Sequence, residues 1–88
     1  IETRAEILDT AKEYVTKDRA ATHGEMENNF NRIADYWTVY TGHQFDADDV
    51  AVMMCLLKIA RIGSNRKNAD NWVDLAGYAA CGGEVSTV

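Results

Sequence analysis

The segment from Ala47 to Ile62 constrains the fold most, because it is apolar on almost every side when arranged as a helix. Asp46 precedes it as an N-cap, Asp49 follows three residues later as in a capping box, and Gly63-Ser64-Asn65 is expected to end it. A helix that is apolar all round should be buried on nearly every side. The other helices of a small bundle cannot cover it completely, so the sequence predicts a homo-oligomer, most simply a dimer packed through this segment.

Three further helices are expected, and no strand. Apolar residues recur at helical spacing over residues 3–16, 25–41 and 69–81. Gly42 and Gly82-Gly83 are expected to stop two of these helices, and Asn68 is a candidate cap for the last one. Residues 17–24 show no period and are expected to form a loop, and residues 84–88 are expected to fray. The prediction is a single all-α domain over residues 1–88, a compact four-helix bundle completed by oligomerisation.

Charge and composition exclude several classes of protein. Nine Lys and Arg against 14 Asp and Glu give a net charge of −5, which disfavours a broad basic face for nucleic acid. No run reaches the roughly 18 apolar residues of a membrane span, and the opening Ile1-Glu2-Thr3-Arg4 lacks the pattern of a signal peptide. We therefore expect a cytoplasmic protein. Cys55 and Cys81 lie among apolar or small residues and are expected to be free thiols.

Motifs of catalysis and of metal binding are lacking. Ser64 and Ser86 have no paired histidine, as a catalytic triad would require. His23 and His43 stand alone in expected loops, so the sequence predicts no zinc site. The glycines are placed as helix stops, not as a phosphate-binding loop. The sequence assigns no catalytic residue and leaves open whether the protein is an enzyme.

Acidic residues offer two candidate sites. Asp49 shares a helical stripe with Met53, Leu56 and Ala60, so it is either a partly buried carboxylate that needs a cation or a capping carboxylate at the helix start. Asp70 and Asp74 are four residues apart and share a helix face with Gly77. That face is either solvated, or approached closely by a ligand or another backbone, because a mid-helix glycine costs about 1 kcal/mol relative to alanine.

Polar and basic residues near these acids also have two interpretations each. The stripe of Glu25, Asn29, Arg32 and Tyr36 borders an apolar seam and is either a satisfied rim or a set of hydrogen-bonding ligand contacts. Lys58 and Arg61, the charges inside the apolar helix, either form salt bridges with Asp70 and Asp74 or hold a ligand phosphate. A basic cluster in the first loop would close over an anion as a lid; it consists of Lys17, Arg19 and His23.

Several stretches resemble a family of small phage and prophage proteins of unknown function. They cover about three quarters of the chain and comprise Arg19 to Gly24, Asn29 to Ala34 with Trp37, Asp49-Val50 with Met53, Leu57 to Arg61, and Asp70 to Ala79. The resemblance implies a phage-encoded protein, and therefore the host cytoplasm.

A more distant resemblance is to the MazG-like, all-α nucleotide pyrophosphohydrolases, in size, helix content and dimer habit. It implies Mg²⁺ held by acids from two helices, with Asp49 and Asp74 as ligands and Glu25 assisting. It also implies that Lys58 and Arg61 neutralise phosphate, and that Asn29 or Trp72 contacts base or sugar, with Asp70 near the ligand. Asn28 stands where the family pattern has a second acid, so the resemblance implies nucleotide binding more directly than hydrolysis.

Three functions follow as hypotheses. The first is a nucleotide-binding, Mg²⁺-dependent relative of these hydrolases. The second is a non-enzymatic phage protein that binds and inhibits a host defence protein, and the third is a structural oligomer without a ligand. Convergence of Asp49, Asp70 and Asp74 with Lys58 or Arg61 in one cleft would favour the first, and their scatter over the surface would favour the second.

Overall fold

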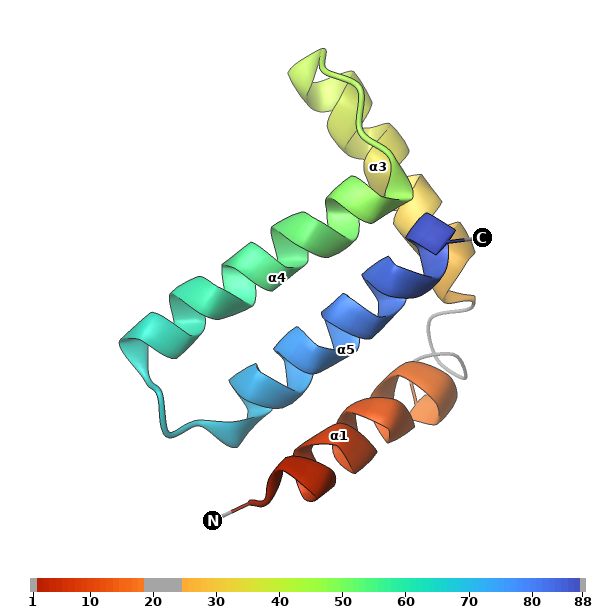
Figure 1. The fold of residues 1–88 in the computed structure, drawn as a ribbon. Helices are drawn as coiled ribbons and strands as arrows, with labels where there is room; N and C mark the ends of the chain where they lie inside the picture. The colour runs from red at the N-terminus through yellow and green to blue at the C-terminus, as the bar shows by residue number, and fades with distance from the viewer. Residues whose placement is uncertain (1, 19–24, 88) are drawn as a thin grey trace.

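A computed structural model describes residues 2–18 and 25–87, all but a few of them in helices (Figure 1). The elements are α1 (Arg4–Glu13), a π-helical turn η1 (Tyr14–Asp18), α3 (Met26–Thr41), α4 (Ala47–Ser64) and α5 (Ala69–Thr87). No strand occurs among these residues, so the all-α prediction is confirmed. None of the helices in these two ranges is both long enough and apolar enough to cross a membrane.

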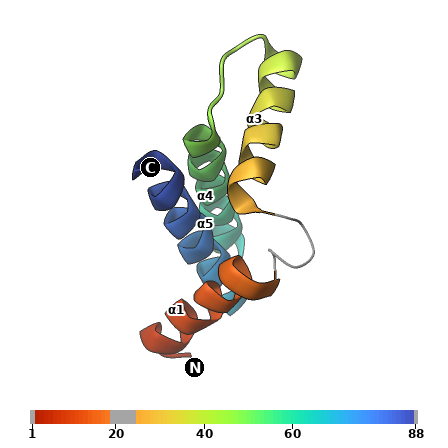
Figure 2. The same ribbon diagram turned by 90° about the vertical axis from the view of Figure 1, so that its right-hand side faces the viewer.

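The helices form a layer with one helix added behind it. α4 and α5 run antiparallel as a hairpin, and α1 lies beside α5 (Figure 1). α3 packs on α4 from one side of this layer, as the turned view shows (Figure 2). None of the described helices lies over the opposite side of the α4–α5 hairpin (Figure 2).

The helix starts follow the capping residues in the sequence. Thr3 precedes α1, where its Oγ1 accepts a hydrogen bond from the Glu6 backbone N–H at 3.2 Å, and Glu6 Oε1 accepts one from the Thr3 backbone N–H at 3.1 Å. At α4, the Asp46 backbone N–H donates to Asp49 Oδ2 at 2.9 Å. The predicted capping role of Asp49 is therefore confirmed, and its carboxylate is exposed.

The helix ends differ more from the prediction. The first helix passes into η1 at Tyr14, so residues 17 and 18 are helical and not in a loop, and residues 19–24 lie outside the described residues. α4 continues past Gly63 to Ser64. The expected stop at Gly82-Gly83 is wrong, because α5 runs on to Thr87, and the expected fraying of residues 84–87 is wrong with it.

Glycine has two different roles in this chain, which explains that error. Gly42 ends α3 in the left-handed conformation at φ 77°, as predicted, and its N–H donates to the Thr38 carbonyl oxygen at 2.9 Å. Gly82 instead lies where α5 crosses α4, and an added Cβ would be 2.9 Å from the Ala51 Cβ. The small residue permits the close helix approach, so it favours continuation of α5 rather than its end.

The core is small and lies between α3, α4 and α5. Its buried cluster consists of Phe30, Ala34, Val50, Ala51 and Cys81. Val50, Ala51 and Ile62 are the buried residues of α4, and the five large apolar side chains of its opposite side are exposed: Val52, Met53, Leu56, Leu57 and Ile59. We call these five residues the outer face of α4. The other described helices thus cover one side of this apolar helix and leave its outer face exposed.

Candidate functional site

A half-buried ion pair joins α4 to α5. Lys58 Nζ lies 3.0 Å from Asp74 Oδ2, and the two side chains are 15% and 17% exposed. The salt-bridge interpretation of Lys58 is confirmed for Asp74. Because the carboxylate neutralises the ammonium group, Lys58 presents little net charge to a phosphate.

Gly77 lies on the same helix, one turn beyond Asp74 at an i, i+3 position, and is buried. A Cβ at Gly77 would be 3.1 Å from Val15 Cγ1, so the glycine allows η1 to approach α5. The interpretation of a solvated acidic face is therefore wrong for Asp74 and Gly77, because α4 and α1 cover both flanks of α5. It holds for Asp70, which is exposed in the first turn. Asn68 caps this turn as predicted, since its Oδ1 accepts from the Asp70 N–H at 3.1 Å.

A cavity of about 150 Å³ lies where α1, η1, α3, α4 and α5 meet. Three residues singled out in the sequence reach it, namely Asn29, Asp74 and Gly77. The other described residues of its wall are apolar or aromatic: Ala11, Tyr14, Val15, Met26, Phe30, Ile33, Val50, Met54, Val73, Tyr78 and Cys81. Sequence reasoning missed these wall residues because apolar residues at helical spacing predict a packed core, and the spacing does not show where the packing is incomplete.

The three predicted metal ligands are not brought together. Asp49 precedes Lys58 by nine residues, about 14 Å along the helix axis, whereas Asp74 contacts Lys58. Glu25 is exposed at the start of α3. Within residues 2–18 and 25–87, the carboxylates close enough to share one ion are those of Asp46, Asp48 and Asp49, all exposed.

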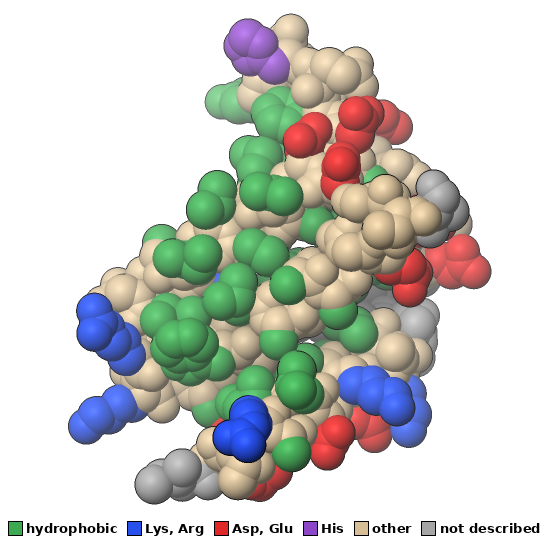
Figure 3. Space-filling view, in the orientation of Figure 1, with side chains coloured by type: hydrophobic (Ala, Val, Ile, Leu, Met, Phe, Trp, Pro, Cys, Tyr) green, Lys and Arg blue, Asp and Glu red, His purple; other side chains and the backbone are tan. Residues whose placement is uncertain are grey.

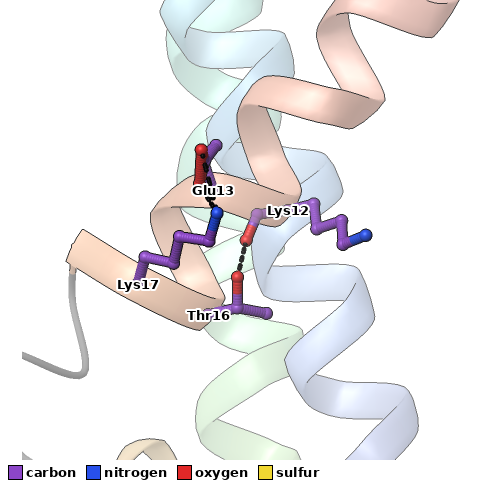
Figure 4. Close-up of polar contacts among 4 residues, drawn as sticks. All are labelled: Lys12, Glu13, Thr16 and Lys17. Atoms are coloured by element: carbon purple, nitrogen blue, oxygen red, sulfur yellow. Dashed lines mark hydrogen bonds and ion pairs between the residues drawn. The ribbon is translucent and has the colours of Figure 1, made fainter.

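The remaining predicted ligand contacts lie outside the cavity. Arg61 is exposed on α4, and the indole N–H of Trp72 donates to the Arg66 carbonyl oxygen at 2.8 Å. Lys17 Nζ pairs with Glu13 Oε2 at 3.2 Å on the surface (Figure 4). The other members of the proposed basic lid, at positions 19 and 23, lie outside the described residues.

Both cysteines are free thiols, as predicted. Cys81 is buried in the core cluster and reaches the cavity. Cys55 is half-buried, with its Sγ 4.0 Å from the Leu75 carbonyl oxygen. Burial raises the pKa of the Cys55 thiol, because a thiolate loses hydration there. A raised pKa lowers the thiolate fraction at neutral pH, which is the reverse of what a reactive cysteine needs.

One face of the molecule is dominated by apolar side chains. Figure 3 shows them gathered over α4 and α5, with most of the Lys, Arg, Asp and Glu toward the margins. Val52, Leu56 and Ile59 are 58%, 58% and 51% exposed, and Trp72 at the start of α5 is 43% exposed. A contiguous apolar surface of this kind is characteristic of interaction sites.

Comparisons with known proteins agree with the phage resemblance. The chain is 49% identical over 74 residues to the Gene 55 protein of Mycobacterium phage L5, an alignment that covers 83% of this chain and 47% of that protein. It is 35% identical over 75 residues to the Gene 55 protein of Mycobacterium phage D29, covering 85% of this chain and 50% of that protein. The chain thus spans about half the length of these relatives. No solved structure matches it. Residues 6–86 match DUF6378, described as a domain of unknown function, and the chain belongs to that family.

Proposed function

We propose that this chain is a non-enzymatic interaction protein that assembles with a second copy of itself through the outer face of α4. The observation that carries the proposal is the exposure of all five large apolar side chains of that face. Burying them recovers about 25 cal/mol for each Å² of apolar surface removed from water. A single chain does not gain this stabilisation, because the five side chains stay exposed.

The dimensions of the chain support incomplete coverage. It exposes 6366 Å², whereas a compact monomer of 9.8 kDa is expected to expose about 5,200 Å². Its radius of gyration is 13.6 Å, against about 12 Å for a compact domain of this length. The excess of about 1,200 Å² is larger than the roughly 800 Å² that each partner buries in a standard interface, so one such interface would account for most of it.

The charge distribution favours a second copy as the occupant. None of the five outer-face residues of α4 is charged, because Lys58 points to Asp74 on the inner side and Asp49, which shares their stripe, lies at the start of the helix. The acids of this helix stand at its start, at Asp48 and Asp49. Two copies related by a two-fold axis could therefore bring these faces together without like charges opposing each other. The net charge of −5 would otherwise disfavour the association of two copies.

Sedimentation equilibrium from about 1 to 100 μM tests the dimer, a range that brackets micromolar dissociation constants. We expect the mass of two chains, and of one chain for the variant Leu56→Glu/Ile59→Glu with unchanged helicity. Val39→Glu is the matched control, since Val39 is exposed on α3 away from this face, and this variant should remain a dimer. A one-chain mass of the unmodified protein at every concentration would contradict the proposal.

The phage relatives suggest the purpose of such a module. Small phage proteins often act by binding, so we propose a host protein, such as a component of a defence system, as the partner of the dimer. Support comes from the phage origin of the relatives and from the scatter of Asp49 and Asp70 over exposed positions. Binding of one host protein at a fixed stoichiometry, lost in the Leu56→Glu/Ile59→Glu variant, would place the partner on the dimer. Binding retained by this monomeric variant would separate host binding from assembly.

The nucleotide and magnesium hypothesis has less support from the geometry. Its three proposed metal ligands lie apart, and Lys58 is already paired with Asp74. The carboxylates nearest to one another are the exposed cap residues of α4. Calorimetric titration with Mg²⁺ and a panel of nucleoside triphosphates tests it, and saturable heat together with pyrophosphate release would revive it.

A further inference from the structure

We propose that the cavity between α1–η1 and the other helices binds a small, neutral, aromatic molecule of about one ring, with Asn29 as its hydrogen-bonding partner. This inference is independent of the dimer, because the cavity wall includes none of the five outer-face residues of α4.

The volume sets the size of the ligand. At about 150 Å³, the cavity has the volume of a closed apolar cavity that accepts benzene in an engineered core, while this one is partly open to solvent. Pockets for drug-sized ligands, the size class of a nucleotide, span roughly 300–1,000 Å³. A single ring with one substituent fits the available space, and a nucleoside triphosphate does not.

The wall favours an aromatic ligand. Every helix contributes apolar side chains to it, including Val50 and Val73, which are almost completely buried. Phe30 and Tyr78 lie on the wall with their ring centroids 6.4 Å apart and their planes inclined at 32°. A third ring beside this pair would gain the edge-to-face or offset contacts that aromatic side chains prefer.

Asn29 supplies the polar selection. Asn29 is half-buried on α3, and its side-chain amide makes no hydrogen bond with any described residue. An amide offers both donors and an acceptor, and none of the described residues has a buried side-chain nitrogen or oxygen without a partner, so the Asn29 amide is open to water or to a ligand. A ligand hydroxyl, amine or amide would satisfy it.

The charges in the wall favour a neutral ligand. Asp74 reaches the cavity and is held by Lys58 at 3.0 Å. An anion would be repelled by this carboxylate, and a cation would have to compete with an ion pair that is already formed. A neutral ring can enter without displacing the Lys58–Asp74 pair.

Binding would also join the amino-terminal helix to the rest of the molecule. Ala11, Tyr14 and Val15 form one wall of the cavity, and α1 otherwise packs mainly on α5. The wall residues of η1 lie in a π-helical turn, a conformation that occurs frequently at functional sites. A ligand in the cavity would therefore hold α1–η1 against α3 and α4 as well.

Nuclear magnetic resonance titration of the whole chain tests the proposal with three probes: phenol, benzene and benzoate. We expect saturable shifts at Asn29, Val73 and Gly77 with phenol and benzene, and none with benzoate. The variant Asn29→Leu should weaken phenol about five- to tenfold, the equivalent of one hydrogen bond, and leave benzene unchanged.

Two further variants locate the bound ring. Ala11→Leu fills the cavity from a buried position of α1 and should abolish binding, whereas Ala79→Leu, on the exposed side of α5, should not. If Ala11→Leu fails to fold, the ratio of the phenol and benzene affinities of Asn29→Leu still tests the proposal. No saturable shift with either neutral probe would overturn the proposal, as would shifts at Leu56 instead of the cavity, or equal losses of phenol and benzene in Asn29→Leu.

Discussion

The two sides of α4 are both rich in apolar residues but have opposite environments. On the inner side, Val50 and Ala51 are 0% and 1% exposed, and Lys58 is paired with Asp74. On the outer side, Val52 and Leu56 are each 58% exposed. Apolar character alone therefore does not decide burial in this helix. The positions of α3 and α5 decide it, and they leave a second apolar surface available for association.

The sharpest test of this comparison places the same substitution on each side. Val50→Asn should destabilise the fold by about 3–4 kcal/mol, because it removes a buried apolar side chain and buries an amide without a partner. Val52→Asn, two residues along the chain, should change the stability of the monomer by less than about 0.5 kcal/mol. Urea denaturation at low protein concentration measures both values.

The control for these two variants is to repeat the measurement over a range of protein concentrations. If the outer side is an interface, Val52→Asn should reduce the gain in melting temperature that the unmodified protein shows as its concentration rises. Equal losses of stability for the two variants in dilute solution would mean that both sides of α4 are buried within one chain.

The ion pair is the second test, since it is the polar contact of the inner side. Asp74→Asn leaves Lys58 half-buried without its anion and should cost about 2 kcal/mol, less than a fully buried pair because water reaches both side chains. Asp70→Asn, on the exposed face of the same helix, should cost less than about 1 kcal/mol through the helix dipole. Chemical denaturation of both variants gives the comparison.

A double substitution separates pairing from packing. Lys58→Met/Asp74→Leu should recover most of the stability that Asp74→Asn loses, because apolar residues of similar volume often replace a buried pair without loss. A double variant that is no more stable than Asp74→Asn would indicate that the charges themselves specify the α4–α5 contact.

Much of the fold was accessible from the sequence, because the signals are local. The periodic apolar residues, the Asp46 and Asn68 caps and the Gly42 stop each depend on neighbours within one or two turns, and the structure confirms them. Gly82 could not be interpreted in this way. Its role depends on Ala51, thirty-one positions away, at a distance that only the packed helices define.

The candidate site was accessible only in part, for the same reason. The sequence singled out Asn29, Asp74 and Gly77, and the structure brings these three to one cavity. Glu25, Asp49 and Arg61 share their residue types but lie at exposed positions. Spacing along a helix predicts which residues share a face, and it does not show which neighbouring helix covers that face.

The third test applies the same comparison to α5, which has a buried glycine at Gly77 and an exposed glycine at Gly83. Gly83 has no atom near its missing side chain, so Gly83→Ala should stabilise the protein by up to about 1 kcal/mol through helix propensity. Gly77→Ala gains the same propensity but places a Cβ 3.1 Å from Val15. We expect it to be less stable than Gly83→Ala by about 1–2 kcal/mol, measured by thermal unfolding. Equal gains would mean that η1 moves freely away from α5.

The smallest effect is expected at the exposed cap of α1, which has no covering helix on either side. Hydrogen bonds from the Thr3 backbone and hydroxyl hold the pKa of Glu6 below its ordinary value of 4.5. A carboxylate whose pKa is lower in the folded than in the unfolded protein stabilises the folded state. This stabilisation is complete above the pKa of the unfolded state and is lost as the pH falls through the pKa of the folded state. The advantage of the unmodified protein over Glu6→Ala should therefore be full at neutral pH and shrink below about pH 4.5. In a Thr3→Ala background the same comparison should show a smaller pH dependence, because the hydroxyl hydrogen bond is lost while the backbone N–H of residue 3, the larger cause of the lowered pKa, can still donate to Glu6. Hydrogen exchange of the first turn of α1 measures this locally, and an advantage that grows as the pH falls would contradict the assignment of the cap.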